Sequence, residues 1–261
     1  MNRPIALLTD FGLKDHYAGS LKGVILGINP KAVAFDVTHD IQPQNIRQGA
    51  FVLQAVYPVL PKGTIVVAVV DPGVGSERQA ICVKTQKGYL VAPNNGILTT
   101  ALEYERVYEV RKIENDRYFR KPVSSTFHGR DIFAPVAAWL SRKDIFGSLG
   151  PRMERIHRLH VPKPTTSRGS VKGEIVYLDH FGNAMTNISR SEVKKAARSG
   201  EVDIFLKGKK RIPLKPFFSA GGPDALIAVW NSADFLELAV KEDSARDKFG
   251  LKIGDPVIVR K

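Results

Sequence analysis

Three short aliphatic runs, separated by stretches with helical periodicity, constrain the fold of this chain more than any other feature. Residues 5–8, 33–37 and 65–70 are rich in valine and isoleucine, as strands buried on both faces of a parallel sheet are. Between them, apolar residues recur every three or four positions, which indicates helices. Strands and helices that alternate in this way form βαβ units, so the sequence predicts an α/β domain with a mostly parallel sheet.

Further runs extend the same pattern along the first part of the chain. Strands are expected at 80–85, 89–92 and 107–110. Helices are expected at 97–103 and 132–140, where apolar residues again follow a helical spacing. The predicted domain therefore reaches well past residue 140.

A loop rich in proline, threonine and serine at 161–169 separates two parts of different character. After it, helical spacing is found only at 191–197 and 245–249, and short strand-like runs with polar turns indicate a small antiparallel barrel or sandwich. The expected strands are 173–178, 202–206, 226–230, 235–240 and 256–259. We predict two domains, an α/β domain at 1–163 and a β-barrel-like domain at 170–261.

Composition argues against several other classes of protein. The 261 residues are 43% hydrophobic, which allows a sizeable core, and no run approaches the length of a membrane-spanning helix. The N-terminus lacks the pattern of a signal peptide, and the single cysteine excludes an internal disulfide framework. That cysteine, Cys82, lies in an aliphatic run and is expected to be a buried strand residue. We expect a cytoplasmic protein with no membrane partner.

The formal net charge of +13 raises the possibility of a nucleic-acid partner. The densest basic stretches are 207–211 and 152–168, and neither interleaves aromatic side chains as a base-stacking surface does. We therefore expect a solvated basic surface rather than a nucleic-acid site. A basic RNA-binding protein remains a further alternative, which salt-sensitive binding would reveal.

Two short polar runs lie where α/β enzymes place their chemistry, at a strand end and a helix start. A glycine-rich turn after the third aliphatic run carries Asp71 and Arg78, and His128 comes just before the helix expected at 132–140. An Asp, an Arg and a His brought together could hold and activate one water molecule. The residues alone leave two alternatives open: a surface ion pair between Asp71 and Arg78, and a structural role for His128.

Asp10 follows the first aliphatic run, at the strand end that faces the ligand crevice of a doubly wound sheet. Its carboxylate could accept both hydroxyls of a ribose, although a helix N-cap or turn is an alternative role. The glycine fingerprints that bind pyrophosphate are absent. We also find no metal-ligand spacing and no nucleophilic serine motif, so no metal is expected.

Six segments in order resemble those of the S-adenosylmethionine (SAM) hydrolases, also called SAM hydroxide adenosyltransferases, which are related to the SAM-dependent fluorinases and chlorinases. The segments are 8–12, 36–39, 71–78, 92–96, 126–131 and 179–183. The resemblance implies a Rossmann-like N-terminal domain, a β-barrel-like C-terminal domain and a homotrimer with active sites between subunits. It also implies hydrolysis of SAM to adenosine and methionine, by attack of water on the ribose C5′ atom, without a cofactor.

The resemblance also assigns expected roles to particular residues. The catalytic triad falls on Asp71, Arg78 and His128. The expected substrate contacts are Asp10 for the ribose, Asp179 for the methionine ammonium, Asn183, Phe181 and Phe218 for the adenine, and Ser232 for the methionine end. In the related halogenases an arginine follows that serine, whereas Ala233 stands here.

Two alternative functions use the same kind of ligand. The halogenases carry Tyr in place of Asp71 and Ser in place of Gly129; an ionised Asp71 would repel a halide, and Gly129 lacks a hydroxyl donor. A non-catalytic binder of adenosine or SAM would keep the substrate contacts but would have no use for the triad. An intact triad therefore favours the hydrolase.

Overall fold

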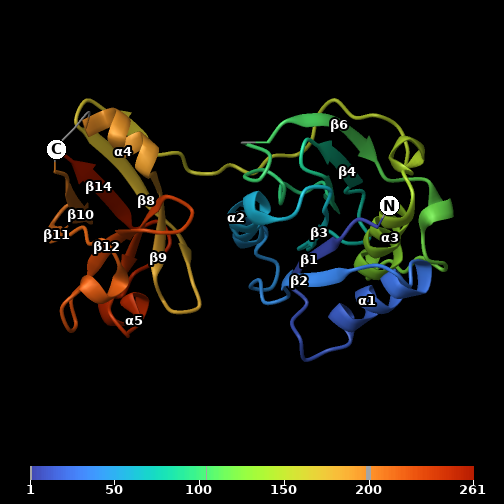
Figure 1. The fold of residues 1–261 in the computed structure, drawn as a ribbon, viewed down its shortest axis with the longest axis horizontal. Helices are drawn as coiled ribbons and strands as arrows, with labels where there is room; N and C mark the ends of the chain where they lie inside the picture. Colours follow the sequence, from blue (N-terminus) through green and yellow to red (C-terminus); the bar gives the residue numbers. More distant parts are fainter. Residues whose placement is uncertain (1, 104, 198–200) are drawn as a thin grey trace. The chain divides into compact units, whose positions relative to one another are not determined.

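The computed structural model describes residues 2–103, 105–197 and 201–261, which belong to two compact units, Met1–His160 and Val161–Lys261 (Figure 1). Unit 1 contains a six-stranded sheet of order β2-β1-β3-β5-β4-β6. Its strands are β1 (Ile5–Thr9), β2 (Ala34–Thr38), β3 (Ile65–Val69), β4 (Ala80–Thr85), β5 (Tyr89–Pro93) and β6 (Val107–Lys112). Strands β2, β1, β3 and β5 are parallel, and β4 runs antiparallel to both of its neighbours. The predicted α/β fold with a mostly parallel sheet is confirmed.

Helices cover both faces of this sheet, which explains why its central strands β1, β3 and β5 are buried along their whole length. Helices α1 (Tyr17–Ile28) and α3 (Ala134–Arg142) pack with Ile5 and Leu7 of β1, whereas α2 (Ile46–Val56) packs with Ala6 and Leu8. All four of these β1 side chains are fully buried. Burial of each large aliphatic side chain stabilises the fold by about 1.5–3 kcal/mol, so alternation with polar residues would be costly here.

The sequence prediction of a helix at 97–103 is wrong, because this segment forms consecutive turns. The hydroxyl of Thr99 donates to the carbonyl oxygen of Gly96 at 2.6 Å, and that of Thr100 donates to Ala50 at 2.6 Å. The local bond of Thr99 offers the backbone an alternative to helix, whereas the bond of Thr100 ties the turns to α2. Apolar spacing alone did not reveal this competition.

The strand order contains a switch point at the carboxyl edge of the sheet. The chain passes from β1 outward to β2 and then returns beyond β1 to β3, so the connections leave in opposite directions from the ends of β1 and β3. Ligands bind at such switch points in doubly wound sheets. Because Thr9 pairs with Val69, Asp10 and Asp71 follow at neighbouring strand ends.

Unit 2 is an antiparallel sheet of order β11-β10-β14-β8-β9-β13-β12 that nearly closes on itself. Its strands are β7 (Thr165–Ser167), β8 (Ser170–Leu178), β9 (Ala184–Ser189), β10 (Asp203–Leu206), β11 (Lys210–Ile212), β12 (Ile227–Trp230), β13 (Phe235–Ala239) and β14 (Pro256–Arg260). The segment after β11 bonds to β12: the amide of Lys215 donates to Ala228, and that of Ala228 donates to Pro213. This contact joins the two ends of the sheet and confirms the barrel-like prediction.

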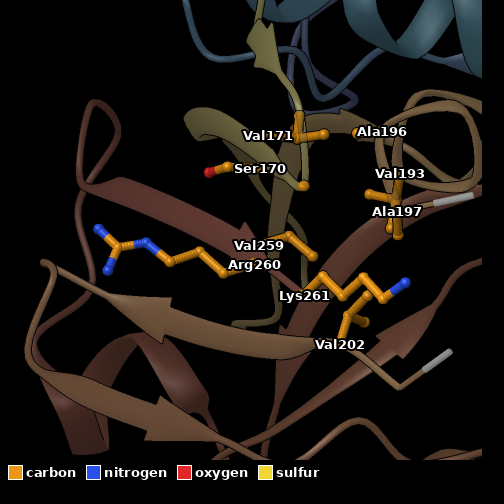
Figure 2. Close-up of a pocket in the computed structure, with 10 residues that line it drawn as sticks. Ser170, Val171, Val193, Ala196, Ala197, Val202, Val259, Arg260 and Lys261 are labelled. Atoms are coloured by element: carbon orange, nitrogen blue, oxygen red, sulfur yellow. The ribbon is translucent and has the colours of Figure 1, made fainter.

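Several details of unit 2 differ from the sequence prediction. The helices α4 (Arg190–Ala197) and α5 (Ala245–Phe249) were expected, but strands β7, β9 and β11 were not. The predicted linker at 161–169 is partly strand, since β7 pairs with the start of β8. A shallow crevice beside α4, lined mainly by aliphatic side chains such as Val171, Val193 and Val259, contains none of the predicted site residues (Figure 2).

Two expectations from composition can be compared with the structure. Cys82 is fully buried in β4, and burial raises the pKa of its thiol far above the usual range, so it is a structural residue as expected. Within residues 2–103, 105–197 and 201–261, no helix has both the length and the apolar character needed to cross a membrane.

Candidate active site

Asp71 and Arg78 form a buried ion pair at the carboxyl end of β3. Arg78 Nε lies 2.9 Å from each carboxylate oxygen of Asp71, and Arg78 Nη2 lies 2.6 Å from Oδ2. The side chains of Arg78 and Asp71 are only 11% and 5% exposed. The alternative of a surface ion pair is therefore wrong, and a pair this well aligned holds both charges in fixed positions.

His128 completes the cluster by contacting the same arginine. Arg78 Nη2 donates to Nδ1 of His128 at 2.6 Å. Since a guanidinium can only donate, Nδ1 must be unprotonated, and the proton of the neutral ring is then on Nε2. Burial and the positive charge of Arg78 lower the pKa of His128 below its usual 6.5. His128 thus offers one N–H donor, while Asp71 offers carboxylate acceptors.

A glycine allows the two loops that carry this cluster to touch. Gly75 has a φ of +78°, and a Cβ added there would lie 2.2 Å from the carbonyl oxygen of Ser125. Only glycine fits both the backbone conformation and the contact. The contact between Gly75 and Ser125 brings together two loops whose residues Arg78 and His128 are 50 positions apart in the sequence.

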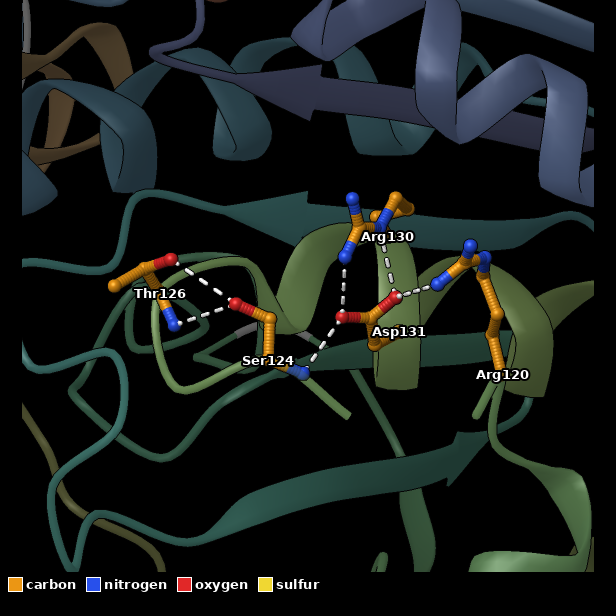
Figure 3. A network of polar contacts seen from close by, with 5 residues as sticks. All are labelled: Arg120, Ser124, Thr126, Arg130 and Asp131. Carbon is orange, nitrogen blue, oxygen red and sulfur yellow. Dashed lines mark hydrogen bonds and ion pairs between the residues drawn. The ribbon is translucent and has the colours of Figure 1, made fainter. Parts of the chain in front are cut away.

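The loop before His128 is anchored by a fully buried carboxylate, Asp131 (Figure 3). Arg130 donates to it through Nε and Nη2, both at 2.8 Å, and Arg120 Nη1 lies at 3.2 Å. The backbone amide of Ser124 also donates to it, at 2.9 Å. Arg130 and these hydrogen bonds hold the pKa of Asp131 below its usual range despite burial. Asp131 therefore fixes the course of the chain that leads to His128.

Asp10 lies at the neighbouring strand end and is half-buried. Its Oδ2 atom accepts the backbone amide of Gln44 at 2.8 Å. Burial raises the pKa of Asp10, and the negative charge of Asp71, at the neighbouring strand end, adds to this effect. Helix α1 begins only at Tyr17, after His16, so Asp10 is not its N-cap.

The turn that carries Asp10 is held by a buried histidine, His39, which lies in the segment 36–39. His39 Nδ1 lies 2.7 Å from the hydroxyl of Thr9, and its Nε2 lies 3.1 Å from Asp36. The amide of Gly12 donates to the carbonyl of His39 at 2.8 Å. His39 is 2% exposed and so joins the loops after β1 and β2 from inside the unit.

In unit 2, Asp179 and Asn183 face each other across the turn between β8 and β9. The backbone amide of Asn183 donates to Asp179 Oδ1 at 2.7 Å, and its side-chain amide donates to Oδ2 at 3.0 Å. Between them, Phe181 is 73% exposed. Phe218, at the start of a short 3-10 helix, and Ser232, in the turn between β12 and β13, are also exposed.

The sequence prediction missed Glu237, a buried carboxylate of unit 2. Its Oε2 accepts from the side-chain amide of Asn231, next to Ser232, at 2.9 Å. Burial raises the pKa of Glu237, and the nearby charge of Asp179 adds to the effect. Glu237 lies between two leucines in β13, and this alternation of apolar and polar residues is typical of a strand with one exposed face. The sequence therefore gave no indication that Glu237 is buried.

Comparison with known proteins places this geometry in a family. The models of the SAM hydroxide adenosyltransferase N-terminal and C-terminal domains match residues 5–150 and 173–258. The chain belongs to the SAM hydroxide adenosyltransferase family. An (R)-S-adenosyl-L-methionine hydrolase of Thermus thermophilus is 37% identical over 98% of both chains. A fluorinase of Actinoplanes sp. is 28% identical over 100% of this chain and 98% of its own.

The fold of this chain is also found in solved structures. An uncharacterized conserved protein from Thermotoga maritima is 38% identical, with a TM-score of 0.92 over 98% of this chain and 100% of that protein. The family membership and its relation to fluorinases confirm the resemblance inferred from the six sequence segments. In the described parts of the chain, no group of three His, Cys, Asp or Glu side chains is placed to hold a metal ion.

Proposed function

We propose that this chain hydrolyses (R)-S-adenosyl-L-methionine to adenosine and methionine. The observation that carries the proposal is the buried Asp71–Arg78–His128 cluster at the switch point of the sheet, beside Asp10. The names of the curated hydrolase relatives supply the substrate and the configuration of its sulfonium. Asp10 would bind the ribose hydroxyls and thereby place C5′ near the cluster.

The chemistry needs an oriented water rather than a strong acid. The sulfonium makes methionine a good leaving group, so the difficulty is to align a weak nucleophile with C5′. Nε2 of His128 can donate to the water oxygen, and Asp71 can accept a water hydrogen with a lone pair that Arg78 leaves free. Positioning of this kind contributes up to about 7–11 kcal/mol in the best cases.

The roles of the unit 2 residues are part of the same proposal. Asp179 would bind the methionine ammonium, Asn183, Phe181 and Phe218 the adenine, and Ser232 the methionine end. The exposure of Phe181 and Phe218 supports a ligand-stacking role. Calorimetric titration of Phe181→Ala with adenosine would measure this contribution, and unchanged affinity would contradict it.

The decisive assay is chromatography of purified protein incubated with a mixture of both sulfonium epimers. The R epimer should disappear and equimolar adenosine and methionine should form. In ¹⁸O-labelled water, the label should enter the 5′-hydroxyl of adenosine. Unlabelled adenosine, or methylthioadenosine as the product, would refute water attack at C5′.

A halogenase is disfavoured by the space around Gly129. A Cβ at this position would lie 3.0 and 3.2 Å from two ring atoms of Phe11, so a serine donor could enter only if that ring shifted. Incubation with fluoride or chloride should therefore give no halogenated adenosine. A pure binder is excluded if wild-type protein turns over SAM and Asp71→Asn does not.

We further propose a homotrimer whose active sites are shared between subunits. The water-orienting residues lie in unit 1 and the adenine and methionine contacts in unit 2, and closed head-to-tail interfaces allow neighbouring chains to combine them. Asp71→Ala and Asp179→Ala should each inactivate the protein. Co-refolding of the two variants should restore activity, because some interfaces then pair two intact halves. Mixed trimers without activity would refute sharing but not hydrolysis.

A further inference from the structure

The dipeptide Asn94–Asn95 lies at the end of β5, under the loop that carries Asp71 and Arg78. In the sheet, β5 lies between β3 and β4, whereas along the chain β3 is followed by β4. The connecting loop, residues 70–79, must therefore cross over the carboxyl end of β5. Any side chain at that strand end is placed to hold the loop from beneath.

Both ends of the crossing loop bond to this dipeptide. At the start, the side-chain amide of Asn95 donates to the carbonyl oxygen of Val70 at 2.7 Å. At the end of the loop, the backbone amide of Asn94 donates to the carbonyl oxygen of Gln79 at 2.8 Å. The side-chain amide of Asn94 also donates to the side-chain oxygen of Gln79 at 3.0 Å. The orientation of the Asn95 amide is fixed, because its Oδ1 accepts the backbone amide of Ile97 at 3.2 Å.

The bond from Asn95 to the Val70 carbonyl influences the position of Asp71, the candidate catalytic carboxylate, through the peptide unit between them. The carbonyl of Val70 belongs to the planar peptide unit that joins Val70 to Asp71. When that carbonyl is held, the direction in which the chain enters the Cα atom of Asp71 is held as well. We propose that Asn95 is a positioning residue that aims Asp71 at the attacking water through the Val70 carbonyl. Its kinetic consequence rests on the proposed hydrolase function.

Three variants separate this role from general stability. Asn95→Ala removes both side-chain bonds. Asn95→Ser keeps an acceptor for the amide of Ile97 but is too short to reach Val70. The matched control is Asn115→Ala, because Asn115 donates to the carbonyl of Ser148 at 2.8 Å and accepts from the amide two residues later, as Asn95 does.

Each variant is assayed for kcat, adenosine affinity and melting temperature. Both Asn95 variants should lose about 100-fold in kcat, the effect of misplacing a catalytic group by about 1 Å, with adenosine affinity unchanged. Asn95→Ser should melt above Asn95→Ala, and Asn115→Ala should melt lower than wild type with normal kcat. Wild-type kcat in Asn95→Ser, or a kcat loss that follows melting temperature across all three, overturns the proposal.

A crystal structure of Asn95→Ser tests the positioning independently of any activity. Displacement of the Asp71 carboxylate from its wild-type position supports the proposal, and an unmoved carboxylate overturns it. If the wild-type protein hydrolyses no SAM, the proposed function fails, and this structural comparison still decides the role of Asn95.

Discussion

Replacement of Gly75 by alanine should nearly abolish turnover while leaving most of the stability intact. The added Cβ would lie 2.2 Å from the carbonyl oxygen of Ser125, and real Cβ contacts essentially never fall below 3.0 Å. The two loops must therefore separate by roughly 0.8 Å, close to the displacement of about 1 Å that can lower a rate about 100-fold. The positive φ adds about 1–2 kcal/mol of backbone strain.

The control for this prediction is Gly63→Ala in the same unit. Gly63 has a φ of +90° and nothing within 4 Å of an added Cβ, so it carries the strain without the clash. Strain of about 1–2 kcal/mol corresponds to a drop of about 2–8 °C in melting temperature for a unit of this size. Gly63→Ala should show that drop with normal kcat. The reasoning is refuted if Gly75→Ala keeps wild-type kcat, or if Gly63→Ala loses as much.

Three further predictions follow from the site. Asp71→Asn should lose turnover but bind adenosine normally by calorimetry; weakened binding of similar size would place Asp71 among the adenosine contacts instead. The pKa of His128 is lowered in the folded state, so the neutral ring stabilises the fold above pH 6.5. Both this stabilisation and turnover should be lost only as the pH falls below 6.5. An acidic limb of the kcat profile centred above pH 6.5 would contradict this prediction. Asp131→Asn should lower the free energy of unfolding by about 1–3 kcal/mol, because it weakens hydrogen bonds from two arginines; denaturant titration with an unchanged midpoint would count against the anchor.

Much of the fold could be predicted from local sequence, whereas the triad of Asp71, Arg78 and His128 was expected only through the family resemblance. Aliphatic runs identified the central strands of unit 1, because β1, β3 and β5 are buried on both faces and cannot alternate. Asp71 and Asp10 were candidates because chemistry gathers at the carboxyl ends of parallel strands, which depends only on strand order. The strands missed in unit 2 were short or polar: β9 contains Thr186 and Asn187, and β11 begins with two basic residues.

The supporting residues escaped prediction because their partners are distant in sequence. Asn95 reaches the carbonyl of Val70, 25 positions earlier, and nothing in the sequence near Asn95 signals that contact. Asp131 was open to interpretation as part of a helix terminus, although its buried carboxylate gathers Arg120 and Ser124 from the preceding loop. Contacts of this kind depend on tertiary structure, so one sequence alone cannot reveal them.

The bonds between residues 213–215 and β12 have a consequence for aggregation. Free strand edges expose unpaired amides and carbonyls that can pair with another chain. In unit 2, the last strands at each end of the sheet, β11 and β12, are bridged through Pro213, Lys215 and Ala228. A variant that loosens this bridge would leave two templates for intermolecular pairing, and we expect it to form fibrillar or amorphous deposits before its hydrophobic core unfolds.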